Sequence, residues 1–196
     1  MVSEAPSKYR IRPSTGSDKS LIDALEARIL PYRAQDALEV QLMFERAIAA
    51  EVSGDPCWMA PIVTDPLVKQ VGLTTSWVAV AKEAEIYGYI GVERFSGSDA
   101  IAQSNPLVMA WQAQGRIAEL RRLRVDESMR GIGVGTALCT AAIEWASEQG
   151  FDLLVVNTTS AQFPALQLYR KLGFQEAGIS YVGKYELVWM ELALGN

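Results

Sequence analysis

The sequence of 196 residues contains no histidine. Without imidazole, the protein cannot use a Ser-His-Asp or Cys-His catalytic arrangement, and it cannot build a metal site that needs histidine ligands. Acid–base chemistry must therefore come from carboxylates, tyrosine, lysine, cysteine, bound water or the substrate itself. We also expect no bound metal ion.

Cysteine is scarce, and long apolar runs are missing. The two cysteines, Cys57 and Cys139, are too few for a disulfide framework, and Cys139 falls in an apolar helical pattern typical of a small buried thiol. No window approaches the roughly 18 consecutive apolar residues of a membrane span, and the first residues form no apolar signal segment. These features favour a cytoplasmic protein in a reducing compartment, without a membrane partner.

The charge balance is mildly acidic. Eighteen basic and 23 acidic residues give a net charge of −5, which argues against a general affinity for nucleic acid. Hydrophobic residues make up 49% of the chain, so there is enough apolar material for a real core. The length suits one domain, which we predict to span 1–196, and a homodimer stays open.

The first part of the chain is divided by proline and glycine into short elements. We predict a strand at 9–12, two helices within 18–52 divided at Pro31, an irregular connection over 53–75, a hairpin of strands at 76–82 and 86–95, and a looser segment at 96–115.

The second part of the chain predicts a β-α-β-α unit. Its elements are a strand at 116–125, a glycine-rich turn at 130–135, helices at 134–149 and 163–172, and an intervening strand at 152–157. The continuous apolar run at 153–156 is typical of a strand that is buried on both faces in a parallel pairing. Two further strands are predicted at 174–182 and 185–194.

One predicted strand changes its apolar phase part-way along. Its apolar residues stand at even positions up to Leu120 and at odd positions from Leu123 on, so the alternation loses step at Arg121 and Arg122. A β-bulge there would keep both apolar sets on the core side and would bend the strand. An amphipathic edge with two solvated arginines is the alternative.

The turn between this strand and the next helix has the sequence Arg130-Gly131-Ile132-Gly133-Val134-Gly135-Thr136. Glycine allows positive φ and a close approach to a ligand, and the N–H groups at the start of a helix stabilise a pyrophosphate. A dinucleotide turn would need glycine at position 136, and a P-loop would need Gly-Lys-Ser/Thr, so neither pattern matches. A tight turn that serves packing alone is favoured for an isolated Gly-x-Gly.

Two motifs, separated by the spacing found in one protein family, indicate a function for this turn. Arg130–Gly135 matches the Q/R-x-x-G-x-G/A signature of the GNAT superfamily of acyl-CoA-dependent N-acetyltransferases, and 165–174 resembles its A-x-x-L-Y-x-K-x-G-F stretch. The resemblance is detailed from about Ala118 to Ala177. It implies an α/β (α+β) fold with a mixed, mostly antiparallel central sheet of about seven strands, helices on both faces, and splayed fourth and fifth strands. The inferred bulge would splay those two strands.

The resemblance also implies an activity. A member of this family transfers an acetyl group from acetyl-CoA, its co-substrate, to a primary amine of a small molecule or peptide by direct attack through a tetrahedral intermediate. A binding module that keeps the acyl-CoA site without transferring the acyl group is the alternative. A third hypothesis, a nucleotide-binding protein that uses the same turn, predicts binding of ATP or NAD in preference to coenzyme A.

Finally, the resemblance implies roles for individual residues. Tyr169 corresponds to the acid that protonates the departing thiolate, and Glu119 to a base that commonly acts through water. The alternatives are an aromatic ring packed against the sheet for Tyr169, and an ion pair near Arg121 for Glu119. Gln162 stands where many family members have asparagine. The implied cofactor-binding residues are Leu123, Arg124, Val125, Arg130, Gly131, Ile132, Gly133, Val134, Gly135, Thr136, Gln162, Ala165 and Tyr169.

Overall fold

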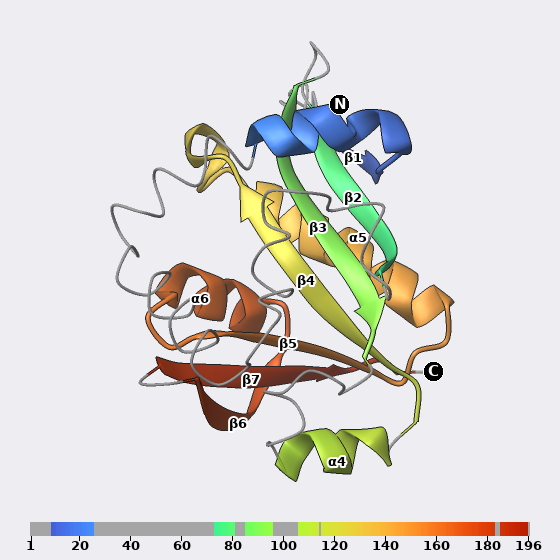
Figure 1. Ribbon diagram of the computed structural model, residues 1–196, viewed down its shortest axis with the longest axis vertical. Coiled ribbons are helices and arrows are strands. Elements are labelled where there is room, and N and C mark those ends of the chain that lie inside the picture. Colours follow the sequence, from blue (N-terminus) through green and yellow to red (C-terminus); the bar gives the residue numbers. More distant parts are fainter. Residues whose placement is uncertain are drawn as a thin grey trace, which may run out of the picture.

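A computed structural model of the chain describes residues 9–25, 73–80, 85–95, 106–113, 115–182 and 185–195. Seven strands in these residues form one sheet in the order β1-β2-β3-β4-β5-β7-β6 (Figure 1). They are β1 (Arg10–Pro13), β2 (Leu73–Val80), β3 (Ile86–Arg94), β4 (Ile117–Val125), β5 (Leu153–Thr159), β6 (Gln175–Val182) and β7 (Tyr185–Ala193). β4 and β5 pair in parallel, and the other neighbours pair antiparallel. The predicted mixed, mostly antiparallel sheet is confirmed.

Helices cover both faces of this sheet. The helical elements are η1 (Gly16–Asp18), the helical residues 19–25, α4 (Pro106–Gln112), η2 (Glu127–Met129), α5 (Val134–Glu148) and α6 (Phe163–Lys171). Leu138 of α5 and Leu166 of α6 belong to one large apolar cluster on the face that we call the α5 face. The opposite face, called the α4 face, carries two smaller clusters, which contain Ile22 and Trp111 respectively.

Sequence and structure agree closely from β4 onward. α5 begins at Val134 as predicted, α6 begins at Phe163, and Pro164 lies in the first turn of α6, where its missing N–H is not needed. The run Leu153–Val156 is buried, as predicted for a strand that is covered on both faces, and its first three residues pair in parallel with β4. Earlier in the chain, the predicted strand at 9–12 and the predicted hairpin correspond to β1, β2 and β3.

Two predictions in the first part were wrong. The segment 96–115, predicted as a looser connection, contains α4, and the connection predicted over 53–75 ends earlier because β2 already begins at Leu73. α4 has seven residues, opens with Pro106 and carries no charge, so it shows no alternation of apolar and polar faces. Residues 19–25 are helical as predicted. The rest of 18–52, with Pro31, and Cys57 lie outside the described residues.

The predicted bulge in β4 is confirmed. Arg122 has a φ of +58°, and the pairing register changes between Tyr89, which faces Arg124, and Gly91, which faces Arg121. β4 therefore carries one more residue than β3 in this interval. A side chain other than glycine at positive φ costs about 1–2 kcal/mol, so the surrounding pairing must enforce this conformation.

Beyond the first part of their ladder, β4 and β5 separate. The two strands pair only where Ile117–Glu119 faces Leu153–Val155. Figure 1 shows β4 and β5 starting side by side and then diverging into a V, with α6 between the arms in this view. We call this opening the split. The splayed fourth and fifth strands implied by the family resemblance are thus present.

No helix among the described residues combines the length and the apolar character needed to cross a membrane.

Candidate active site

The glycine-rich turn connects β4 and η2 to α5. Gly131 and Gly133 have φ values of +76° and +94°, and Gly133 is the N-cap residue of α5. Residues with a Cβ rarely adopt these conformations, so glycine at both positions lets the chain turn sharply into the helix.

The start of α5 presents backbone donors to an open surface. The first intrahelical bond runs from Ala137 N to Gly133 O over 2.9 Å, and no side chain caps the helix end. The N–H groups at the start of a helix have no intrahelical acceptor, and the helix dipole adds positive charge there. An ideal Cβ placed on Gly131 meets nothing within 4 Å, and Ile132 is 42% exposed. These features fit a diphosphate group.

The first turn of α5 also contacts both walls of the split. An ideal Cβ on Gly135 would lie 3.3 Å from Leu168 Cδ2 of α6 and 3.6 Å from Val125 Cγ2 of β4. Glycine at this position therefore brings α5 close to the two elements that flank the split. The first turn of α5, the end of β4 at Val125 and α6 at Leu168 therefore lie next to one another, and the cofactor-binding role of these elements stays a prediction.

Three further residues implied to bind the cofactor lie on α6 or directly before it. Tyr169 is 5% exposed, belongs to the large cluster on the α5 face, and packs its ring against Phe174 with 5.6 Å between centroids. Gln162 precedes the helix, and its Oε1 accepts a hydrogen bond from Thr158 Oγ1 over 3.0 Å. Ala165 is partly buried against the same cluster. The acid role of Tyr169 stays a prediction.

Glu119 lies on the other face of the sheet, the α4 face, and is only 3% exposed. Its Oε1 accepts a hydrogen bond from Asn157 Nδ2 over 3.0 Å, and its Oε2 lies 3.3 Å from Arg121 Nη2. Arg121 Nε also donates to a carboxylate oxygen of Glu93, which pairs directly opposite Glu119 across the ladder. The ion pair named as the alternative for Glu119 is therefore present, and it leaves a catalytic role open to test.

Sequence reasoning missed Glu93 and Asn157. They lie 28 residues from Arg121 and 38 residues from Glu119 respectively, and only the register of three strands brings these side chains together. No local motif marks either residue.

The split connects two different chemical environments. The glycine-rich turn and the buried phenol of Tyr169 lie on the α5 side, whereas Glu119 and the charged groups around it lie on the α4 side. A thioester held in the split would therefore have a potential acid on one face of the sheet and a carboxylate on the other.

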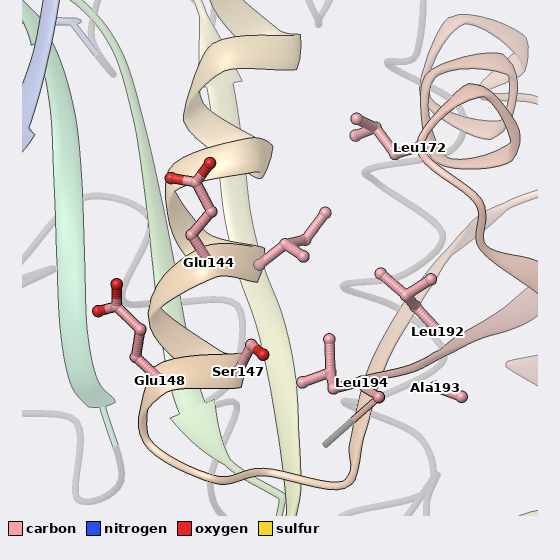
Figure 2. A pocket seen from close by; sticks show the side chains of 9 residues that line it. Glu144, Ser147, Glu148, Leu172, Leu192, Ala193 and Leu194 are labelled. Atoms are coloured by element: carbon pink, nitrogen blue, oxygen red, sulfur yellow. The ribbon is translucent and has the colours of Figure 1, made fainter.

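A hollow of about 610 Å³ lies elsewhere, between the second half of α5 and the end of β7. Figure 2 shows Leu172, Leu192 and Leu194 on one side of it and Ser147 on the other, while Glu144 and Glu148 point away. Its lining begins at Ile143, nine residues after the start of α5, which corresponds to about 14 Å along the helix axis. The hollow is thus separate from the turn.

Cys139 and the acidic residues were the other candidates for chemistry in the described part of the chain. Cys139 is fully buried in α5, as predicted, and burial raises the pKa of its thiol to about 12, so it is a poor nucleophile at neutral pH. Among the described residues, no group of three or more Cys, Asp or Glu side chains is placed to hold a metal ion.

Comparison with known proteins decides the family. Residues 46–174 match the sequence profile of the acetyltransferase (GNAT) family. The chain belongs to this family. Human N-acetyltransferase 8B is 30% identical over 105 residues, which are 54% of this chain and 40% of that protein. The matched part of this GNAT chain thus spans less than half the length of that curated relative.

Solved GNAT structures share the fold of the chain. The ribosomal-protein-S18-alanine N-acetyltransferase from Escherichia coli has a TM-score of 0.60 at 14% identity, covering 96% of this chain and 95% of that one. Arabidopsis thaliana NAA60 in complex with acetyl-CoA has a TM-score of 0.57 at 15% identity, covering 96% of this chain and 99% of that one. The GNAT fold predicted from the two motifs is confirmed.

Proposed function

We propose that this GNAT protein transfers the acetyl group of acetyl-CoA to a primary amine. The observation that carries the proposal is the backbone at the start of α5. Gly131 and Gly133 have positive φ, and no side chain caps the helix that follows them. Family membership supports the same conclusion. A cytoplasmic location and a homodimer stay predictions.

The binding roles follow from the backbone. The N–H groups within 131–136 hold the diphosphate, with the exposed side chain of Arg130 at the rim. The segment 123–125 of β4 borders the split, where an extended pantetheine chain pairs with it like a strand. Gln162 and Ala165 border the same path from α6.

The chemical step needs acceptors for two protons of the ammonium group and a donor for the departing sulfur. An alkyl ammonium group has a pKa near 10, so it must lose a proton before attack, and Glu119 accepts that proton through water. The neutral amine nitrogen then forms a bond to the thioester carbon, the positively charged nitrogen of the tetrahedral intermediate releases its second proton to solvent, and the carbon–sulfur bond breaks. Tyr169 donates its phenolic proton to the departing sulfur, and solvent returns a proton to the phenol. No covalent bond to the protein is required.

Release of free thiol tests this proposal. The protein is incubated with acetyl-CoA and, separately, with an amino acid, a polyamine, an aminoglycoside and a peptide with a free N-terminus. We expect at least one acceptor to produce thiol at a rate proportional to protein concentration. Tight binding of acetyl-CoA without thiol release from any acceptor would favour the non-catalytic acyl-CoA-binding module instead.

A further inference from the structure

Asn157 connects the two arms of the split through its side chain. Glu119 is the last residue of β4 that pairs with β5, opposite Val155, and Asn157 stands two residues further along β5. The hydrogen bond from Asn157 Nδ2 to Glu119 Oε1, 3.0 Å long, therefore crosses the sheet where the strands begin to separate.

The chemistry of the two groups determines the orientation of this contact. An ionised carboxylate only accepts hydrogen bonds, so the amide nitrogen of Asn157, and not its oxygen, must face Glu119. The second carboxylate oxygen lies 3.3 Å from Arg121 Nη2. One oxygen of Glu119 is thus held by Asn157 of β5 and the other by Arg121 of its own strand β4, which gives the buried carboxylate one orientation at the opening of the split.

Arg121 alone would hold the carboxylate less firmly. Arg121 also forms an ion pair with Glu93 on β3. The side chain of Glu93 is 15% exposed, whereas that of Glu119 is 3% exposed. α4 has no charged residue, and Glu191 of β7 accepts a hydrogen bond from Trp111 Nε1 over 2.6 Å. Asn157 and Arg121 thus both hold the Glu119 carboxylate, and Arg121 does so while it also pairs with Glu93.

We propose that Asn157 is a positioning residue for the acetyl transfer: its amide holds the Glu119 carboxylate in one orientation across the split. This inference rests on the proposed role of Glu119 as the base. Asn157 touches neither the acetyl group nor the amine in this proposal, and it acts only through Glu119.

Asn157→Leu tests the proposal because leucine has a similar size and no donor. We expect kcat to fall about tenfold, as the loss of one hydrogen bond to a charged group predicts, with the KM for acetyl-CoA unchanged. The acidic limb of the pH–rate profile should move to higher pH, because a donor stabilises the ionised form of Glu119. A merely structural role for Asn157 would leave this limb in place.

Two further variants make the test selective. Asn157→Asp keeps the shape of the side chain but places a second carboxylate beside Glu119, so we expect a larger loss of kcat than with leucine. Gln175→Leu removes an exposed amide on the edge strand β6 and should leave kcat and the pH profile unchanged. Thermal unfolding followed by circular dichroism identifies the variants that are folded.

A double-mutant cycle with Glu119→Gln separates the positioning role of Asn157 from the base role of Glu119. If Asn157 acts through Glu119, Asn157→Leu should cause no further loss of kcat in the Glu119→Gln background. A tenfold loss in both backgrounds would overturn the proposal, and so would a wild-type kcat for folded Asn157→Leu when Glu119→Gln is impaired. Full activity of Glu119→Gln would instead refute the base role of Glu119 itself.

Discussion

Replacing Gly133 by alanine separates the cofactor role of the turn from its role in folding. Gly133 has a φ of +94°, where a residue with a Cβ costs about 1–2 kcal/mol. The added Cβ would lie 3.4 Å from Tyr9 Oη, an ordinary contact, so the free energy of unfolding should fall by this strain alone. For a chain of this size, each 1 kcal/mol corresponds to about 2–4 °C in Tm.

Binding of acetyl-CoA should suffer more than folding. A methyl group on the surface that holds the diphosphate displaces at least one backbone hydrogen bond to a charged oxygen, which contributes about 1.5–3 kcal/mol. We therefore expect the Kd of Gly133→Ala for acetyl-CoA, measured by isothermal titration calorimetry, to rise by about 10- to 100-fold.

Gly150 provides a matched control at the opposite end of α5. Its φ is +70°, and an added Cβ would lie 3.0 Å from the flexible end of the Arg116 side chain. Gly150→Ala should lower Tm by a similar amount and leave the Kd for acetyl-CoA unchanged. The reasoning is refuted if folded Gly133→Ala binds acetyl-CoA like the wild type, or if both variants weaken binding equally.

Three further predictions concern other parts of the molecule. Tyr169→Phe should lower kcat at least tenfold with little change in the Kd for acetyl-CoA, because the ring still packs against Phe174, and an undiminished kcat would eliminate the acid role. Thr159 Oγ1 is buried without a hydrogen-bond partner among the described residues, so Thr159→Val should raise Tm by about 2–4 °C in thermal unfolding, and a lower Tm would show that the hydroxyl is satisfied in solution. The hydrogen bonds from Arg12 lower the pKa of Asp18 to about 2. The ionised Asp18 therefore stabilises the folded state by about 2 kcal/mol above the unfolded pKa near 4, and this stabilisation is lost as the pH falls towards 2. Urea unfolding at pH 6 and pH 2.5 should show this loss in the wild type but not in Asp18→Asn, and parallel losses would contradict the assignment.

The part of the fold that the sequence predicted well is the part whose signals are local. Positive-φ glycines bound α5 on both sides, and the apolar run at 153–156 marks a strand buried on both faces. The bulge at Arg122 also left a trace in the sequence, because an extra residue shifts the apolar alternation by one position.

The part that escaped prediction depends on contacts between distant segments. Val108 and Trp111 of α4 are buried against β5 and β7, but the exposed positions Pro106 and Ala110 are apolar as well, so the sequence of α4 shows no polar face and resembles an irregular apolar connection. Asn157 and Glu93 reach Glu119 only through the register of β3, β4 and β5. Such a register follows from the whole sheet and leaves no motif in any one strand.

Amide hydrogen exchange with bound coenzyme A tests the central claim most directly. Coenzyme A should slow exchange of the backbone N–H groups within 131–136, whereas pantetheine, which lacks the diphosphate, should leave exchange in this turn unchanged. The N–H groups of the edge strand β6 serve as an internal control and should not respond to either compound. Protection by coenzyme A at another place in the chain, with no change in this turn, would contradict the claim that the diphosphate binds at the start of α5.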